Sequence, residues 1–111
     1  MDIDTLTFGE MKQIRALLGG ASAYADHPYK LGSCYLVETV TKFWLGKLVG
    51  ITPGELVLDQ ASWIPDTGRY NEALKNGTAN EVEPVEGEVI IGRGSIVDVV
   101  VWNKPLLRAV K

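Results

Sequence analysis

The sequence contains a single cysteine, Cys34, and a single histidine, His27, among 111 residues. One thiol excludes an intrachain disulfide and a zinc site built from several cysteines. Cys34 lies among strand-forming residues, where a cysteine usually acts as a small buried hydrophobe. The residue types would allow a catalytic pair of Cys34 and His27, although nothing in their spacing favours it. We therefore expect no metal, no cofactor and no disulfide.

Long apolar runs and blocks of one charge are also missing. No stretch approaches the roughly 18 apolar residues of a membrane-spanning helix, and residues 1–10 are acidic, without the apolar run of a signal peptide. The formal charge is -3, and acidic and basic residues are interspersed along the chain without a Lys/Arg-rich block. We expect a cytoplasmic protein that binds neither membranes nor nucleic acid.

What is present is a globular composition, with 46% hydrophobic and 23% charged residues, enough for one domain with a modest core. Residues 1–20 predict an N-terminal helix, because Thr7 and Glu10 form a capping box and Gly19 stands at the expected end. One stripe of this helix is apolar and is expected to pack on the β core: Phe8, Met11, Ile14, Leu17 and Leu18.

Residues 33–64 are rich in β-branched and aromatic side chains and predict a β-hairpin region. Gly46 and Gly50 indicate bends or bulges, Pro53 sets the turn, and Pro65 is expected to end the returning strand. Alternation puts Phe43, Leu45, Val49 and Ile51 on one face of the first strand, and Trp44 and Leu48 on the other.

A short helix is predicted over residues 66–77, with Asp66 or Thr67 as its N-cap and Gly77 at its end. The acidic segment that follows, residues 79–87, reads as a connector. The carboxylates in and directly after this segment have no defined ligand geometry, so a solvated rim is favoured over a metal site: Glu81, Glu83, Glu86 and Glu88.

Residues 88–102 predict two C-terminal strands, and 92–95, "GRGS", favour a hairpin turn over an anion-binding nest. Both faces of the last strand are apolar, so we expect a second subunit to cover one of them. The tail, residues 103–111, is the alternative cover. Period 2 divides the strand into Val97, Val99 and Val101 on one face and Ile96, Val100 and Trp102 on the other.

The triplet Asp66-Thr67-Gly68 is the signature of aspartic proteases, and "VIIGRG", residues 89–94, echoes their second motif. The interval between them leaves no room for a flap. Arg69 would also hold Asp66 ionised, whereas a shared-proton dyad needs one neutral carboxyl. We therefore interpret Asp66 as a helix cap and expect no catalytic residue.

These patterns together predict an α+β fold: a small, mostly antiparallel, β-barrel-like domain of SH3 or Sm size. It would carry an N-terminal helix and one short helix inserted between strands, in a single domain over residues 1–111.

Four separated segments carry a resemblance. They are Thr39-Val40-Thr41 with Gly46-Lys47-Leu48, the run from Ala61 to Arg69, Glu81 to Pro84, and Ile90 to Ser95. Over roughly residues 29–111 the chain resembles a family of short β-rich proteins of bacterial and phage genomes, for which no activity is secure. The resemblance implies fold and provenance, and implies nothing about chemistry.

Two functions follow as hypotheses. The first is a non-enzymatic, homo-oligomeric β module of phage or prophage type, a structural or interaction protein that self-associates through the strand 96–102. The second is a small-ligand binder that sequesters a nucleotide-derived signal, with aromatic side chains stacking on a base and arginines holding an anionic group. The candidate ligand-binding residues are Trp63, Asp66, Arg69, Tyr70, Arg93 and Trp102.

Overall fold

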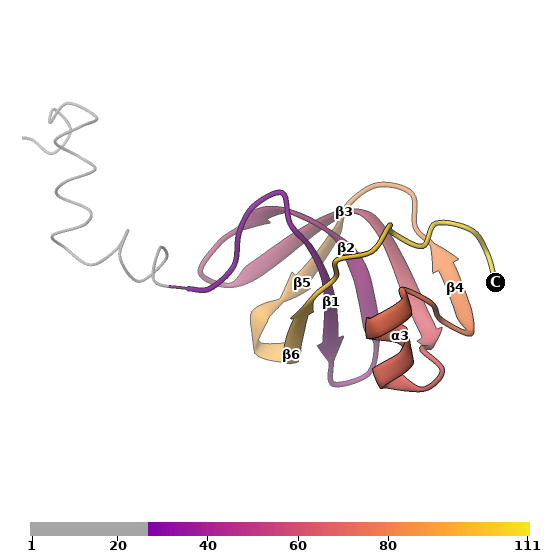
Figure 1. Cartoon of the computed structure of the whole chain (residues 1–111). Coiled ribbons are helices and arrows are strands. Elements are labelled where there is room, and N and C mark those ends of the chain that lie inside the picture. The colour runs from indigo at the N-terminus through magenta and orange to yellow at the C-terminus, as the bar shows by residue number, and fades with distance from the viewer. Residues whose placement is uncertain (1–26) are drawn as a thin grey trace, which may run out of the picture.

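The computed structural model describes residues 27–111, so the helix predicted over residues 1–20 lies outside the described residues. The described part is a six-stranded sheet with one short helix (Figure 1). Its elements in chain order are β1 (Cys34–Thr39), β2 (Phe43–Ile51), β3 (Glu55–Asp66), α3 (Tyr70–Asn76), β4 (Glu81–Pro84), β5 (Val89–Gly92), the 3-10 turn η1 (Arg93–Ser95) and β6 (Ile96–Val101).

All strand pairs are antiparallel, in the order β4-β3-β2-β1-β6. The long strand β3 pairs with β2 on one side, and its other side is shared by β5 near Glu55 and β4 near Asp66. The prediction of a small, mostly antiparallel α+β fold is confirmed. The prediction of a barrel-like closed sheet is wrong, because β5 and β6 do not pair with each other and the sheet stays open.

The predicted hairpin turn at residues 92–95 is also wrong. The chain leaves β5 through η1 and enters β6, which pairs with β1 at the far side of the sheet. A one-turn 3-10 helix redirects the chain between two different strand partners, which a tight hairpin would not allow. No anion nest forms either, since Gly92 has a φ of -67° and Gly94 is not among the positive-φ glycines.

The pairing of β2 with β3 is irregular near both predicted glycines. The register shifts between Leu45 and Lys47, where the extra residue lies on β3, and again between Leu48 and Gly50, where it lies on β2. At Gly46 a Cβ would lie 3.0 Å from the Leu58 Cβ, so the two strands approach too closely for a larger residue. The extra residue on β2 changes the phase of the alternation beyond it. Contrary to the prediction, Ile51 therefore packs in the same cluster as Leu48, and Val49 is exposed.

Two hydrophobic clusters lie on opposite faces of the sheet, because neighbouring residues of β1 belong to different ones. The first, which we call the inner core, contains Tyr35, Val37, Leu48, Ile51, Leu56, Leu58, Ala61 and Ile91. The second, the outer core, contains Leu36, Leu45, Ile64, Ala79, Val82 and Trp102. Leu74 of α3 and two tail residues, Leu106 and Leu107, pack against the outer core.

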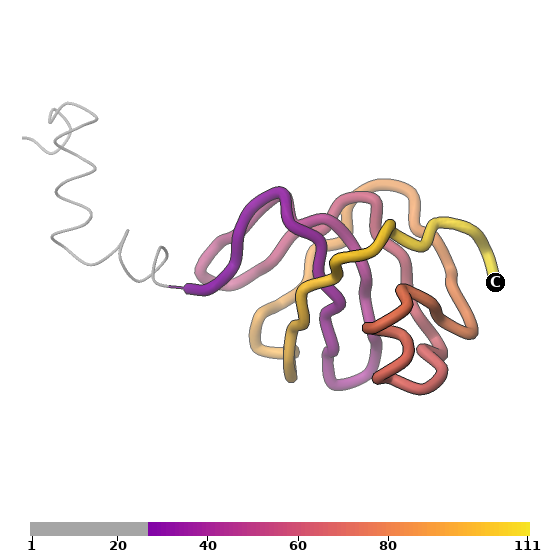
Figure 2. Tube along the Cα trace, viewed as in Figure 1, coloured from indigo at the N-terminus to yellow at the C-terminus, as the bar shows by residue number. Residues whose placement is uncertain are grey.

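The tail covers this outer face of the sheet. A cover supplied by the tail was the predicted alternative to a cover supplied by a second subunit. Figure 2 shows residues 103–111 running back from β6 toward β4. The Ser62 hydroxyl donates to the Leu107 carbonyl at 2.6 Å, the Arg108 guanidinium donates to the Ala61 carbonyl, and the backbones of Val82 and Lys111 exchange two hydrogen bonds of 3.0 Å. The chain's own tail and helix therefore bury Trp102.

Strand β6 departs from strict alternation. Its register with β1 shifts between Glu38 and Thr39, and past that irregularity Ile96 packs against the inner core together with Val99. The predicted grouping of Ile96 with Val100 and Trp102 is therefore wrong. Val97 and Val101 are 59% and 52% exposed.

The short helix and the acidic segment also differ from prediction. Strand β3 continues through Pro65 to Asp66, and α3 begins at Tyr70 with Arg69 as its N-cap. Gly77 closes the helix at a φ of 71°, as expected for a left-handed cap. Residues 81–84 form β4 instead of a connector, because Val82 is buried between exposed glutamates.

Candidate functional site

The predicted ligand-binding residues do not converge. Trp102 is buried, and its indole Nε1 donates to the Pro105 carbonyl at 3.1 Å, so its ring is not available to stack on a ligand. The sequence alone does not show that the tail folds back over Trp102, so Trp102 was counted among the candidate ligand-binding residues.

Trp63 lies on a different surface. It pairs across the strands with Trp44 and is 37% exposed, and the Lys42 Nζ lies 5.6 Å from the Trp44 ring and 5.9 Å from the Trp63 ring. The cation rests over two indoles and covers part of their surface. A hollow of about 300 Å³ adjoins Trp63 at the turn between β1 and β2.

Asp66, Arg69 and Tyr70 surround the start of α3 and each has a local partner. One Asp66 carboxylate oxygen accepts from the Gly68 N–H at 2.8 Å and the other accepts from the Asn80 side chain at 3.4 Å. This is an Asx turn instead of the predicted helix cap, and Gly68 takes the required φ of 74°. The exposed Arg69 side chain pairs with Glu72 at 4.0 Å.

Tyr70 and two carboxylates form an acidic corner beside α3. Glu38 of β1 lies directly opposite Asp98 of β6. Desolvation, then the charge of Asp98 and a hydrogen bond to it, raise the pKa of Glu38 above its ordinary value. Burial, followed by the charges of Asp98 and Glu38, raises the pKa of Tyr70. The corner therefore stores like-charge repulsion at neutral pH.

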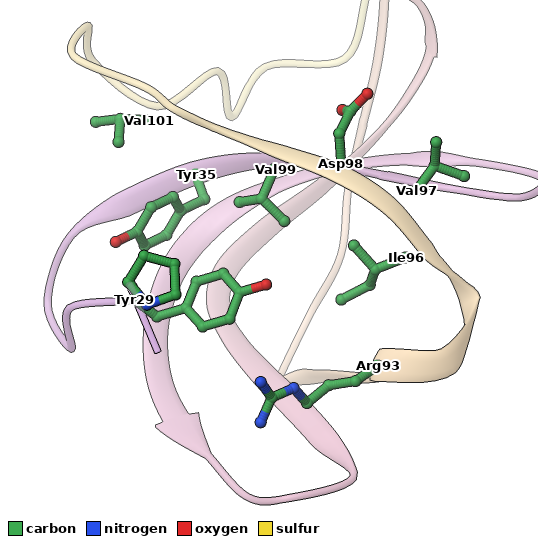
Figure 3. A pocket seen from close by; sticks show the side chains of 9 residues that line it. Tyr29, Tyr35, Arg93, Ile96, Val97, Asp98, Val99 and Val101 are labelled. Atoms are coloured by element: carbon green, nitrogen blue, oxygen red, sulfur yellow. The ribbon is translucent and has the colours of Figure 1, made fainter. Parts of the chain in front are cut away.

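Arg93 lines a larger groove between β6 and the loop before β1, which we call the β6 groove (Figure 3). It has a volume of about 460 Å³. The loop before β1 contributes Pro28 and Tyr29, and β1 contributes Tyr35. The remaining lining residues come from η1 and β6: Arg93, Ile96, Val97, Asp98, Val99 and Val101.

The polar end of the groove is held rigidly. The Arg93 side chain donates from Nη1 to the Thr52 carbonyl at 2.8 Å, and its backbone N–H donates to the Gly54 carbonyl at 2.9 Å. Its guanidinium lies 5.6 Å from the Tyr29 ring centroid. Tyr29 in turn meets Tyr35 edge to face at 6.0 Å. These contacts place one cation and two aromatic rings along a single wall.

Sequence reasoning missed Tyr29 and Tyr35. Tyr29 follows a proline in a loop, and Tyr35 alternates like a core residue, so neither position carries a binding motif. Tyr35 is indeed buried, and its hydroxyl accepts from the Lys30 N–H at 2.9 Å. The signal that joins them to Arg93 is the pairing of β1 with β6, which links distant parts of the sequence.

No protein-family model, no curated protein and no solved structure matches the chain. Within residues 27–111, no cluster of three or more metal-ligating side chains is present. No helix in the described part of the chain has the length and apolar character needed to cross a membrane.

Proposed function

We propose that the chain is a non-enzymatic, homo-oligomeric β module whose subunits join through β6, as a structural or interaction protein. The observation that carries this proposal is the edge position of β6. In the described part of the chain, β6 pairs with β1 on one side and has no strand on the other. An edge strand offers unpaired backbone groups to another chain.

The hydrogen-bonding phase identifies those groups. The Trp102 N–H donates to the Cys34 carbonyl at 2.9 Å, which makes these two residues a hydrogen-bonded pair. Antiparallel ladders alternate such pairs with unbonded ones, so Val100 bonds to Leu36, whereas the N–H and C=O groups of Val99 and Val101 face away from β1.

The side chains of β6 suit self-pairing. An antiparallel arrangement centred on Val99 would set each Val97 against the partner's Val101, and it would bury the two most exposed valines of the strand. In the same register Asp98 would lie opposite the partner's Val100, so no two aspartates would face each other. This self-complementarity supports a two-fold symmetric contact.

The Asp66 contacts favour a non-enzymatic role for the triplet Asp66-Thr67-Gly68. Its carboxylate oxygens accept hydrogen bonds from Gly68 and Asn80, which are the contacts of a turn. A protease dyad would need this carboxylate to share a proton with a second carboxyl group.

Sedimentation equilibrium at micromolar concentration tests the assembly. We expect wild type to exceed the monomer mass. Val101→Pro should give a folded monomer, because its N–H faces outward and proline removes only that donor. Val100→Pro should instead unfold the protein, since its N–H bonds to β1. Ile90→Lys, at an equally exposed aliphatic position on β5, should keep the wild-type mass. A monomeric wild type, or an unchanged mass in Val101→Pro, contradicts the proposal.

A further inference from the structure

We propose that the β6 groove binds a nucleoside monophosphate, with Arg93 on the phosphate and Tyr29 against the base. This site differs from the set of residues predicted from sequence, since only Arg93 belongs to both. The groove shares Val97 and Val101 with the β6 contact proposed above, whereas Arg93 and Tyr29, the two residues that would hold the ligand, lie outside that strand.

The charge of the groove favours an anion. Arg93 has no carboxylate within ion-pair distance among residues 27–111, and Figure 3 shows Asp98 pointing away from Arg93 and Tyr29. The nearby Glu55 carboxylate accepts from the Thr52 hydroxyl instead. A guanidinium has five N–H donors, and only Nη1 is engaged with Thr52, so donors remain for a phosphate.

The shape of the groove favours a ligand that also carries a planar ring. Figure 3 shows the Tyr29 ring projecting into the hollow between Arg93 and Val99. A tyrosine ring can stack on any nucleobase, and the valines of β6 supply an apolar wall on the opposite side of the groove. The volume of about 460 Å³ lies within the range of small-molecule sites, about 300–1,000 Å³.

The Arg93 side chain is also positioned before any ligand arrives. Its hydrogen bond to the Thr52 carbonyl and its cation–π contact with Tyr29 hold the guanidinium, so little side-chain freedom is lost on binding. By contrast, Arg69 is 78% exposed and only pairs with Glu72 on the same helix. Arg69 is therefore the matched control for a cation outside a groove.

Isothermal titration calorimetry of the full chain tests the site with adenosine 5′-monophosphate, adenosine and inorganic phosphate as probes. Adenosine 5′-monophosphate should bind, and each of the two part-ligands should bind about tenfold more weakly or worse. Arg93→Gln and Tyr29→Leu should each weaken binding of the monophosphate about tenfold. Arg93→Lys should fall between wild type and Arg93→Gln, because it keeps the charge and loses the fork.

Thermal melts and native mass separate this site from folding and from assembly. The Arg93 variants should keep the wild-type mass, so a loss of binding in a folded protein of unchanged mass assigns the effect to the groove. The proposal is overturned if wild type does not bind adenosine 5′-monophosphate. It is equally overturned if Arg93→Gln binds as tightly as wild type, or if Arg69→Gln loses as much affinity as Arg93→Gln.

Discussion

Glu38 and Asp98 face each other directly across β1 and β6, and the pKa of Glu38 lies above its ordinary value of 4.5. A carboxyl with a raised folded-state pKa contributes stability that is complete below its unfolded value and is lost as pH rises through its folded value. The folded protein is therefore expected to lose part of its stability as pH rises above 4.5.

Glu38→Gln should remove this loss. We expect the variant to melt at a higher temperature than wild type at pH 7 and to converge with it near pH 4, because a glutamine cannot ionise. Thermal melts across this pH range measure the difference. Glu83→Gln on β4 provides a control, since Glu83 lies across from Trp63 instead of from a carboxylate. A wild-type advantage at pH 7 would contradict the assignment.

Gly46→Ala should lower the free energy of unfolding by about 1–3 kcal/mol, the usual range for overpacking. Its added Cβ would lie 3.0 Å from the Leu58 Cβ and 3.1 Å from the Asp59 carbonyl oxygen, both within the strand pairing. Gly54→Ala is the matched control, because nothing lies within 4 Å of its Cβ position. Urea denaturation compares the two, and equal stability would show that the pairing of β2 with β3 at Gly46 can relax.

Leu107→Ala should cost roughly 1–2 kcal/mol, since the side chain is half-buried against the outer core. Val110→Ala should stay within about 0.5 kcal/mol, because Val110 is 74% exposed. The loss at Leu107 should not depend on protein concentration if the tail covers its own subunit. A concentration-dependent loss would instead indicate that tails are exchanged between subunits.

Asp66→Asn should change stability by well under 1 kcal/mol, because an asparagine oxygen can accept the Gly68 N–H in the same turn. Asp66→Ala removes that acceptor and should cost about 1 kcal/mol. Denaturant titration of both variants checks the pair. If Asp66→Asn folded normally but abolished an activity found in wild type, the turn interpretation would be incomplete and a catalytic role would return.

Local signals in the sequence were sufficient for many elements. Gly46 and Gly50 marked the register shifts between β2 and β3, and Gly77 marked the end of α3, because each depends on backbone geometry within a few residues. A phase error arose just beyond Gly50. Ile51 packs with Leu48 because the extra residue on β2 shifts its period of two.

Long-range pairing accounts for most of what the sequence could not show. The tail was only an alternative cover for Trp102, because its docking depends on Ser62 and Ala61, far away along the chain. The β6 groove could not be predicted for the same reason, since Tyr29 contacts Arg93 only after β1 pairs with β6. Candidate binding residues chosen by type alone were therefore scattered over several surfaces.

The pairing of β1 with β6 also bears on how the chain reaches its fold. Strand β1 pairs with β2 across a short turn. Its other neighbour is β6, where Tyr35 pairs with Val101, so this second pairing forms only after most of the chain has been ordered. Contacts between such distant residues slow folding, because a large loop must close before they form. During synthesis on the ribosome, β1 therefore remains an open edge until β6 has emerged.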